Sequence, residues 1–260
     1  MEVLDLKGKK GLVVGIANDE SLAAWAAKHF HQAGAELAIT YFNDKAKPFV
    51  EPIAQRLAAA LFLPCNVTVA GQLEAVFDAI AKRWGKLDFV FHSIASARKE
   101  EIQGRLMDCS ADGFAEAMVI SCHSLIKMAK LAEPLMSNGG SITTLTYLGA
   151  EKVVEHYNVM GPVKAALEAS VRYLAHEMGK QGVRVNAISA GPIKTRAASG
   201  ILHFDELLNE VARKSPQHRL IDACEVGKTA LLLASDYASA ITGEIVHVDG
   251  GFHIEGMVFH

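Results

Sequence analysis

Short apolar runs alternate along the whole chain with longer segments in which apolar residues recur at helical spacing. The apolar runs predict seven strands, at residues 10–14, 36–41, 61–65, 87–92, 141–146, 184–189 and 244–248. The amphipathic segments predict helices at about 21–33, 47–59, 69–84, 112–135, 157–180, 204–213 and 225–234. Strands without polar alternation are typical of a parallel sheet that helices cover on both faces.

This unbroken alternation predicts a single α/β domain over residues 1–260, without a linker or an internal repeat. Right-handed crossovers then give a Rossmann-like, doubly wound sheet of seven parallel strands in the order 3-2-1-4-5-6-7. A chain of 260 residues is long for one domain, but this length is usual for a single α/β unit.

Composition and charge exclude several classes of protein. The net charge of -3 gives no basic surface for nucleic acid. No apolar run reaches about 18 residues, so we expect no membrane span. The segment Met1–Lys10 carries two acidic residues and three lysines and does not resemble a signal peptide. We therefore expect a cytoplasmic protein. The four cysteines are widely spaced and predict free thiols rather than a disulfide or zinc framework: Cys65, Cys109, Cys122 and Cys224.

The turn after the first strand is a candidate dinucleotide site. Gly15 permits close approach of a pyrophosphate, and Ser21 can cap the following helix while offering its hydroxyl to phosphate. The turn lacks G-x-G-x-x-G, so an ordinary strand-to-helix turn explains it equally well. After the second strand, Asp44 falls late for a ribose contact. Lys45 and Lys47 suit either a 2′-phosphate or a solvated helix start, and the lack of a nearby arginine favours NADH over NADPH.

Polar residues also follow the third and fourth strands, where ligands bind in sheets of this kind. Asn66 suits a ligand contact, a turn or a helix cap, and Ser93 lies at the end of strand four. His92 is interpreted as a packed strand residue. At the fifth strand, Tyr147 closes the strand, and Tyr157 and Lys164 stand seven residues apart, which places them on one face wherever the segment is helical.

The spacing of tyrosine and lysine is the most specific signal. Short-chain dehydrogenases typically carry Tyr-x3-Lys, but the residue four before Lys164 is Met160. The Tyr-x6-Lys spacing resembles the divergent branch of that superfamily, the enoyl-acyl-carrier-protein reductases of bacterial fatty-acid synthesis. The resemblance covers essentially the whole chain, through TYLGAEK at 146–152, YNVMG at 157–161, GVRVNAISAGPIKTRAASGI at 182–201 and GEIVHVDGGF at 243–252.

This resemblance implies an NADH-dependent reduction of the trans-2 double bond of an enoyl thioester carried by acyl-carrier protein. Hydride goes to the β-carbon, and negative charge develops on a thioester oxygen three bonds away. The hydroxyl that stabilises this charge must therefore lie further from the nicotinamide than in a ketone reductase, which gives a reason for the shifted tyrosine. The resemblance implies that Tyr157 stabilises this oxygen and that Lys164 holds the nicotinamide ribose. Tyr147 would line the pocket or aid proton transfer.

The resemblance also implies a full set of site residues and no metal. The cofactor contacts are Gly15, Ser21, Leu22, Phe42, Asn66, Val67, Ser93, Ile94, Lys164, Pro192, Ile193 and Thr195. The substrate contacts are Ala97, Tyr147, Tyr157, Met160, Ala197 and Ile201. Two positions depart from the family: Phe42 stands where NADH-using relatives commonly carry glutamine, and Asn66 replaces a usual aspartate.

Residues 194–213 combine small and apolar side chains, which predicts either a lid over the acyl chain or a short docked surface helix. The resemblance further implies a homotetramer, with acyl-carrier protein attracted to basic residues such as Arg196. Two other functions stay open: an ordinary short-chain carbonyl reductase, which the missing Tyr-x3-Lys disfavours, and an idle NAD-sensing regulator, which the retained Tyr157 and Lys164 disfavour.

Overall fold

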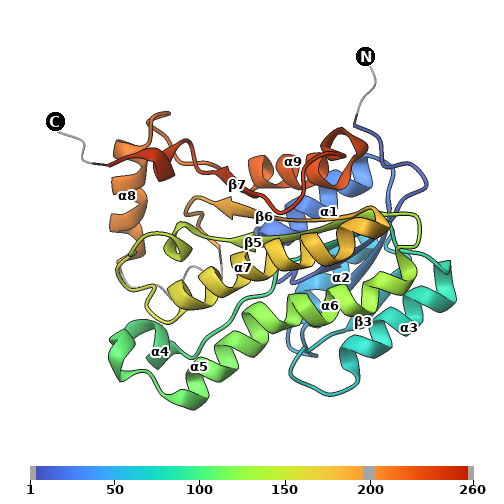
Figure 1. Cartoon of the computed structure of the whole chain (residues 1–260), viewed down its shortest axis with the longest axis horizontal. Helices are drawn as coiled ribbons and strands as arrows, with labels where there is room; N and C mark the ends of the chain where they lie inside the picture. Colours follow the sequence, from blue (N-terminus) through green and yellow to red (C-terminus); the bar gives the residue numbers. More distant parts are fainter. Residues whose placement is uncertain (1–3, 196–202, 257–260) are drawn as a thin grey trace.

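The computed structural model describes residues 4–195 and 203–256. Within them one sheet of seven parallel strands has the order β3-β2-β1-β4-β5-β6-β7, which confirms the predicted topology (Figure 1). Every predicted strand is present, with ends that differ by no more than about two residues. The strands are β1 Lys10–Val14, β2 Glu36–Tyr41, β3 Leu61–Pro64, β4 Phe89–His92, β5 Gly140–Thr146, β6 Val183–Ala190 and β7 Ile245–Val248.

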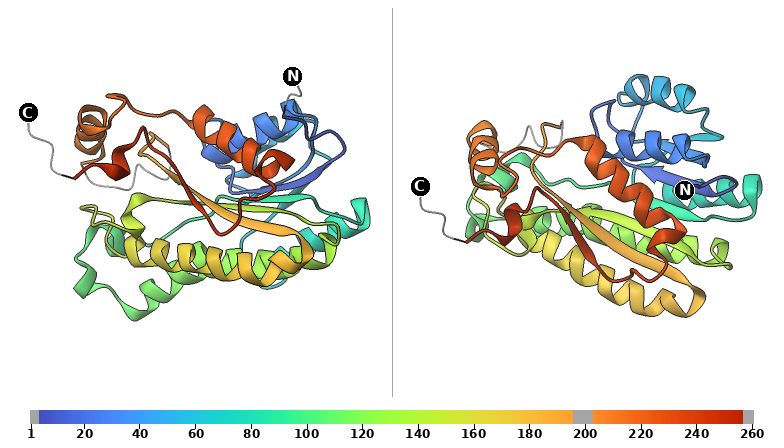
Figure 2. Two further views of the ribbon diagram at one scale, coloured as in Figure 1. Left: turned by 45° about the horizontal axis from the view of Figure 1, so that its top comes forward. Right: turned by 90° about the horizontal axis from the view of Figure 1, so that it is seen from above.

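Helices cover both faces of the sheet, as the apolar strands require. Their bounds are α1 Leu22–Gln32, α2 Lys47–Arg56, α3 Gln72–Trp84, α4 Lys99–Gln103, α5 Ala111–Met118, α6 Ser124–Ala132, α7 Met160–Met178, α8 Phe204–Lys214 and α9 Ala223–Ala234. Apolar residues of α3, α6 and α7 form one core with the sheet, and those of α1, α2 and α9 form the other (Figure 2). None of the described helices is long and apolar enough to cross a membrane.

Close packing between β1, β4 and α1 fixes the centre of the sheet. The Phe30 ring lies 4.6 Å from the Phe89 ring and 5.8 Å from the Phe91 ring, centroid to centroid. Gly11 makes room for this cluster, because a Cβ there would lie 2.0 Å from Phe89 Cζ. All strands run the same way, so their carboxyl ends meet at one edge, beside which α8 lies (Figure 1).

The predicted helix at 112–135 is interrupted. It consists of α5, a π-helical turn at Val119–His123, α6 and a 3₁₀ turn at Glu133–Leu135. The π turn has a local purpose, because its buried Ser121 bonds both backbone groups of Ser96, accepting from the nitrogen at 3.0 Å and donating to the oxygen at 3.1 Å. The helix therefore holds the loop that follows β4.

One helix was not predicted, and three predicted helices are shorter by about three residues at one end: α2 ends at Arg56, α3 begins at Gln72 and α7 begins at Met160. Helix α4 was not predicted, because its five residues are too few to show helical periodicity. The helix expected from about residue 157 begins at Met160 instead, so Tyr157 precedes α7.

Candidate active site

The carboxyl ends of β1 and β4 form the point where the strand order reverses, which is where dinucleotides bind in such sheets. Gly15 has φ +102, and a Cβ at this position would lie 1.9 Å from the Ser93 carbonyl oxygen. The two loops therefore touch backbone to backbone. Any side chain at position 15 would collide with the Ser93 backbone, so only glycine permits this close approach of the two loops, as the turn of a dinucleotide site requires.

Ser21 begins α1 but does not cap it with its side chain, so the predicted serine cap was wrong. The hydroxyl instead donates a hydrogen bond to the Asn18 carbonyl in the preceding turn, at 2.7 Å. The start of α1 is thus without a side-chain cap, which suits an anion-binding helix N-terminus.

The loops that follow β2 and β3 contain the two residues that depart from the family pattern. Asn66 forms a turn after β3: its Oδ1 accepts hydrogen bonds from Thr68 N at 3.0 Å and from Thr68 Oγ1 at 2.8 Å. Phe42 follows β2 and is 56% exposed, so its ring is available to a flat ligand. Lys45 is exposed, and Lys47 lies at the start of α2 with its Nζ 5.8 Å from the Tyr41 ring centroid.

The remaining cofactor candidates line the same edge of the sheet. Val67 and Ile94, which follow β3 and β4, pack against one core, and Leu22 and Ile193 pack against the other. Pro192 is buried directly after β6, and Thr195 is partly buried.

Two tyrosine rings meet at the end of β5. The rings of Tyr147 and Tyr157 pack edge to face, with centroids 5.0 Å apart and planes inclined by 69°. Burial raises the pKa of Tyr147 to about 12. Burial also raises the pKa of Tyr157, with further contributions from Tyr147 and Glu168. Both phenols therefore stay protonated at neutral pH and can donate hydrogen bonds.

Tyr157 lies in a turn before α7, so the segment is not helical at the tyrosine and the condition for a shared helical face with Lys164 is not met. The flanking residues His156 and Asn158 have φ +62 and +33, outside the helical region. The Tyr157 amide donates to the Val154 carbonyl at 3.2 Å, and its own carbonyl accepts from Met160 N at 2.9 Å. The ring rests on Gly149, where a Cβ would lie 2.4 Å from Tyr157 Cδ1.

Lys164 is buried in α7 and points its ammonium group at the end of β5. Its Nζ donates to the Leu145 carbonyl at 2.7 Å, and burial lowers its pKa to about 8 although Glu168 opposes this shift. Glu168, one helical turn later, accepts a hydrogen bond from Thr146 Oγ1 at 2.7 Å. Burial raises the pKa of this carboxyl group, and the bond from Thr146 opposes the rise. Both side chains fasten α7 to the residues just before Tyr147.

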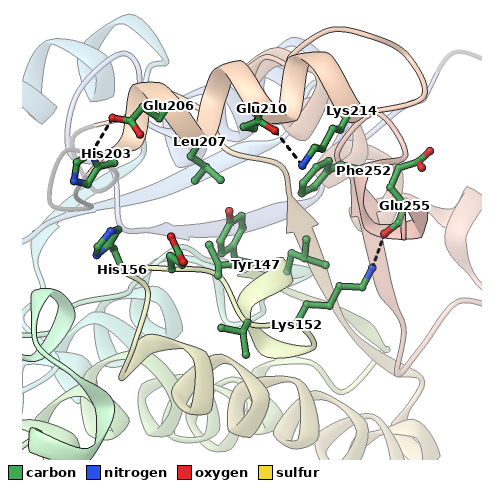
Figure 3. Close-up of a pocket in the computed structure, with 14 residues that line it drawn as sticks. Tyr147, Lys152, His156, His203, Glu206, Leu207, Glu210, Lys214, Phe252 and Glu255 are labelled. Carbon is green, nitrogen blue, oxygen red and sulfur yellow. Dashed lines mark hydrogen bonds and ion pairs between the residues drawn. The ribbon is translucent and has the colours of Figure 1, made fainter. Parts of the chain in front are cut away.

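A cavity of about 570 Å³ opens in front of Tyr147 (Figure 3). Figure 3 shows the Tyr147 hydroxyl directed toward α8, and Leu207 pointing from α8 into the cavity. His156 and His203 stack at one end, with ring centroids 5.3 Å apart. Such a cavity between a helix and a loop suits an elongated, partly apolar ligand.

Three predicted substrate residues come together in a small apolar cluster. Met160 is buried in it, and Ala97 and Tyr157 pack against it. Met160 occupies the position four before Lys164, so the first turn of α7 has a thioether where ordinary short-chain dehydrogenases carry a phenol. The predicted substrate residues Ala197 and Ile201 lie outside the described residues.

Other buried polar groups have structural partners. His92 lies between Thr144 Oγ1 and Ser124 Oγ, each at 2.8 Å, and burial lowers its pKa to about 3, so it is a neutral packed residue as predicted. All four cysteines are free thiols, of which Cys65 and Cys122 are buried. In the part of the chain that the structure describes, no three acidic, histidine or cysteine side chains could hold a metal ion.

Sequence reasoning missed several residues that shape this site: Gly149, Ser121, Asn158 and Glu168. Gly149 and Asn158 stand inside the quoted motifs, but only the fold shows what each contacts. Nothing in the linear pattern pointed to Ser121 or Glu168.

The comparisons with known proteins agree with this geometry. Residues 15–253 match the family model described as Enoyl-(Acyl carrier protein) reductase. The NADH-dependent enoyl-[acyl-carrier-protein] reductase 1 of Rhizobium meliloti is 52% identical over 97% of this chain and 93% of its own length. A crystal structure of the reductase from Anaplasma phagocytophilum in complex with NAD is 50% identical, with a TM-score of 0.94 over 99% of this chain and 98% of that chain.

The reductase from Bacillus cereus, in complex with NADP+ and indole naphthyridinone, is 46% identical, with a TM-score of 0.95 over 97% of this chain and 99% of that chain. The family model spans most of the chain, and the similarity to these relatives extends over nearly the full length of both partners. The chain therefore belongs to the enoyl-(acyl carrier protein) reductase family.

Proposed function

We propose that the chain is an NADH-dependent enoyl-[acyl-carrier-protein] reductase, which reduces the trans-2 double bond of an enoyl thioester in the last step of fatty-acid elongation. The observation that carries the proposal is the group at the end of β5: two protonated phenols and a buried lysine, with Met160 in the usual place of the tyrosine. The names of the relatives, which specify NADH and an acyl-carrier-protein substrate, support the same function.

In this proposal Tyr157 donates a hydrogen bond to the thioester carbonyl oxygen. NADH supplies, when bound, the hydride that goes to the β-carbon. Negative charge then accumulates on the carbonyl oxygen, and an oriented donor that meets it contributes about 3–4 kcal/mol to the transition state. A proton delivered to the α-carbon then completes the saturated acyl thioester. The raised pKa of Tyr157 keeps this donor protonated at neutral pH.

Lys164 has two roles in the proposal: it holds the nicotinamide ribose and places positive charge near the developing anion. One of its protons is already directed to the Leu145 carbonyl, which fixes the ammonium group and leaves two further donors. Tyr147 lines the acyl pocket, with its hydroxyl in the cavity under α8 (Figure 3). Within the predicted lid at 194–213 of this single domain, Leu207 on α8 faces the cavity and can exclude water, whereas residues 196–202 lie outside the described residues.

The residues at the cofactor end fit NADH. Gly15 lets the turn after β1 lie directly against the Ser93 backbone, and the start of α1 has no side-chain cap. Phe42 offers an exposed ring after the end of β2. We therefore assign the cofactor contacts to the residues predicted above, with NADH preferred over NADPH. Because the Bacillus cereus reductase was crystallised with NADP+, the assay should compare NADH with NADPH.

An assay of reduced-nicotinamide absorbance with crotonyl and longer enoyl thioesters tests the proposal. We expect NADH oxidation with enoyl thioesters and none with ketones, and a loss of about 10²–10³ in kcat for Tyr157→Phe. Oxidation with ketones alone would establish a carbonyl reductase. Binding of NADH without any turnover would establish a regulator.

We further propose a homotetramer in the cytoplasm, with acyl-carrier protein as a transient partner. Exposed apolar side chains on neighbouring helices support the assembly: Ile126 on α6 is 37% exposed, and Tyr173 on α7 is 73% exposed. Light scattering of the wild type and of Tyr173→Glu tests this assembly, and an unchanged mass for the variant would contradict the use of this face. Arg196, the predicted attraction for the carrier, lies outside the described residues.

A further inference from the structure

The turn that carries Tyr157 is held by its neighbour in sequence. Asn158 Nδ2 donates hydrogen bonds to the carbonyl oxygens of Ile102, at 2.6 Å, and Gly104. These carbonyls belong to the end of α4, where helix geometry leaves oxygens without partners. One amide group from 54 residues further along the chain therefore closes the end of this helix.

The chemistry of this contact requires an amide. A carboxamide nitrogen has two hydrogens and can serve two carbonyls at once, whereas a carboxylate of the same shape can only accept. Asn158 also has φ +33, a conformation that asparagine tolerates better than most residues. His156 on the other side of Tyr157 has φ +62, so the phenol is carried by a strained turn that needs tertiary contacts to persist.

Helix α4 is itself firmly attached. The buried Glu101 accepts a hydrogen bond from the Ser110 amide at 3.1 Å and another from the Ser110 hydroxyl, and Ser110 in turn caps α5. Ile102 and Tyr157 both pack against the apolar cluster that contains Met160. A continuous series of contacts thus runs from α5 through α4 and Asn158 to the Tyr157 turn.

We propose that Asn158 is a positioning residue for the reaction: its amide holds the Tyr157 turn against α4 and so fixes the direction of the phenol hydroxyl. The inference rests on the proposed function, because it assigns Asn158 a role through Tyr157. Asn158 does not touch the reacting atoms, so its loss affects turnover more than cofactor binding.

Two variants separate the amide from the backbone. Asn158→Asp keeps the shape but faces two carbonyls with a carboxylate, and Asn158→Gly relieves the backbone strain while removing the hydrogen bonds. Asn138→Asp, on an exposed turn far from the site, is the matched control for the change in charge. We expect kcat to fall about 10- to 100-fold in both Asn158 variants, with the Kd for NADH within about twofold of wild type and the control unchanged.

Hydrogen exchange provides a readout that does not depend on turnover. Faster amide exchange at residues 99–104 and 156–160 in the Asn158 variants, with the sheet unchanged, would show that the amide holds the Tyr157 turn against α4, and together with the loss of kcat it supports the inference. A wild type that acts on no enoyl thioester would refute the proposed function, whereas unchanged exchange in these two segments would overturn the inference itself. Unchanged kcat in Asn158→Gly would overturn the inference. A lower Tm with unchanged kcat for the folded enzyme would overturn it as well, since that is the pattern of a purely structural contact.

Discussion

Substitution of Gly149 by alanine is the sharpest test of where the phenol lies. Gly149 has no positive φ, so alanine fits its backbone without strain. The added Cβ, however, would lie 2.4 Å from Tyr157 Cδ1 and 2.8 Å from Cε1, whereas ordinary contacts begin at 3.4 Å. The ring must therefore move by about 1 Å, away from Gly149 and relative to the Tyr147 ring.

The effect on rate should exceed the effect on stability. A displacement of about 1 Å in a catalytic group costs about 10²-fold in rate, and the local overpacking costs about 1–3 kcal/mol of unfolding free energy. The assay is NADH oxidation with crotonyl thioester, beside urea unfolding. Gly179→Ala is the matched control, because a Cβ at Gly179 meets nothing within 4 Å. We expect this control to keep wild-type kcat.

A double-mutant cycle shows whether the loss passes through Tyr157. If Gly149→Ala acts by displacing the phenol hydroxyl, it should cause no further loss of kcat in a Tyr157→Phe background. Additive losses would mean that Gly149 affects turnover by another route. Wild-type kcat in Gly149→Ala would refute the reasoning outright, since the ring would then not depend on this contact.

Four other predictions concern charge and hydrogen bonding. Burial lowers the pKa of Lys164 to about 8, so kcat/KM should fall as pH rises through this value, and Lys164→Arg should shift that limb upward in a pH–rate profile. Between about pH 8 and 10.5 Lys164 binds a proton in the unfolded chain more strongly than in the fold. The free energy of unfolding, measured in urea, should therefore rise with pH across that window. Thr146→Val removes the donor to the buried Glu168 carboxylate and should lower the unfolding free energy by about 1–3 kcal/mol at neutral pH in urea titrations. Asp222→Ala breaks the capping box of α9 and should cost about 1 kcal/mol in the same titration with kcat unchanged.

The strands were predictable because burial on both faces leaves a direct mark on the sequence. The run Glu36–Tyr41 is a strand with the predicted ends, since its four central residues are all buried. The order of strands followed from the handedness of crossovers, and it also brought Gly15 and Ser93 to one edge. The strands, their order and the edge of the sheet that carries the site could therefore be predicted from the sequence.

Features set by contacts between distant loops could not be predicted from it. Helix α4 is too short for periodicity, and the π turn at Val119–His123 leaves no compositional mark. Ser21 suited a helix cap by type, but in the structure its hydroxyl donates to the Asn18 carbonyl and accepts no hydrogen bond from a helix amide. The spacing of Tyr157 and Lys164 suggested a helical face, whereas the structure places the tyrosine in a turn.

This last difference bears on how the site is built. A tyrosine on the face of a helix inherits its position from the backbone hydrogen bonds of that helix. Tyr157 lies before α7, between two residues of left-handed backbone, and must be held by its surroundings instead. Gly149 provides the surface under the ring, Tyr147 meets it edge to face, and Asn158 ties its turn to α4. In the proposed reaction the negative charge develops on the thioester oxygen, away from the carbon that accepts hydride, so the phenol must lie away from the helix. A phenol in that place depends on Gly149 and Asn158 as well as on Tyr157 itself.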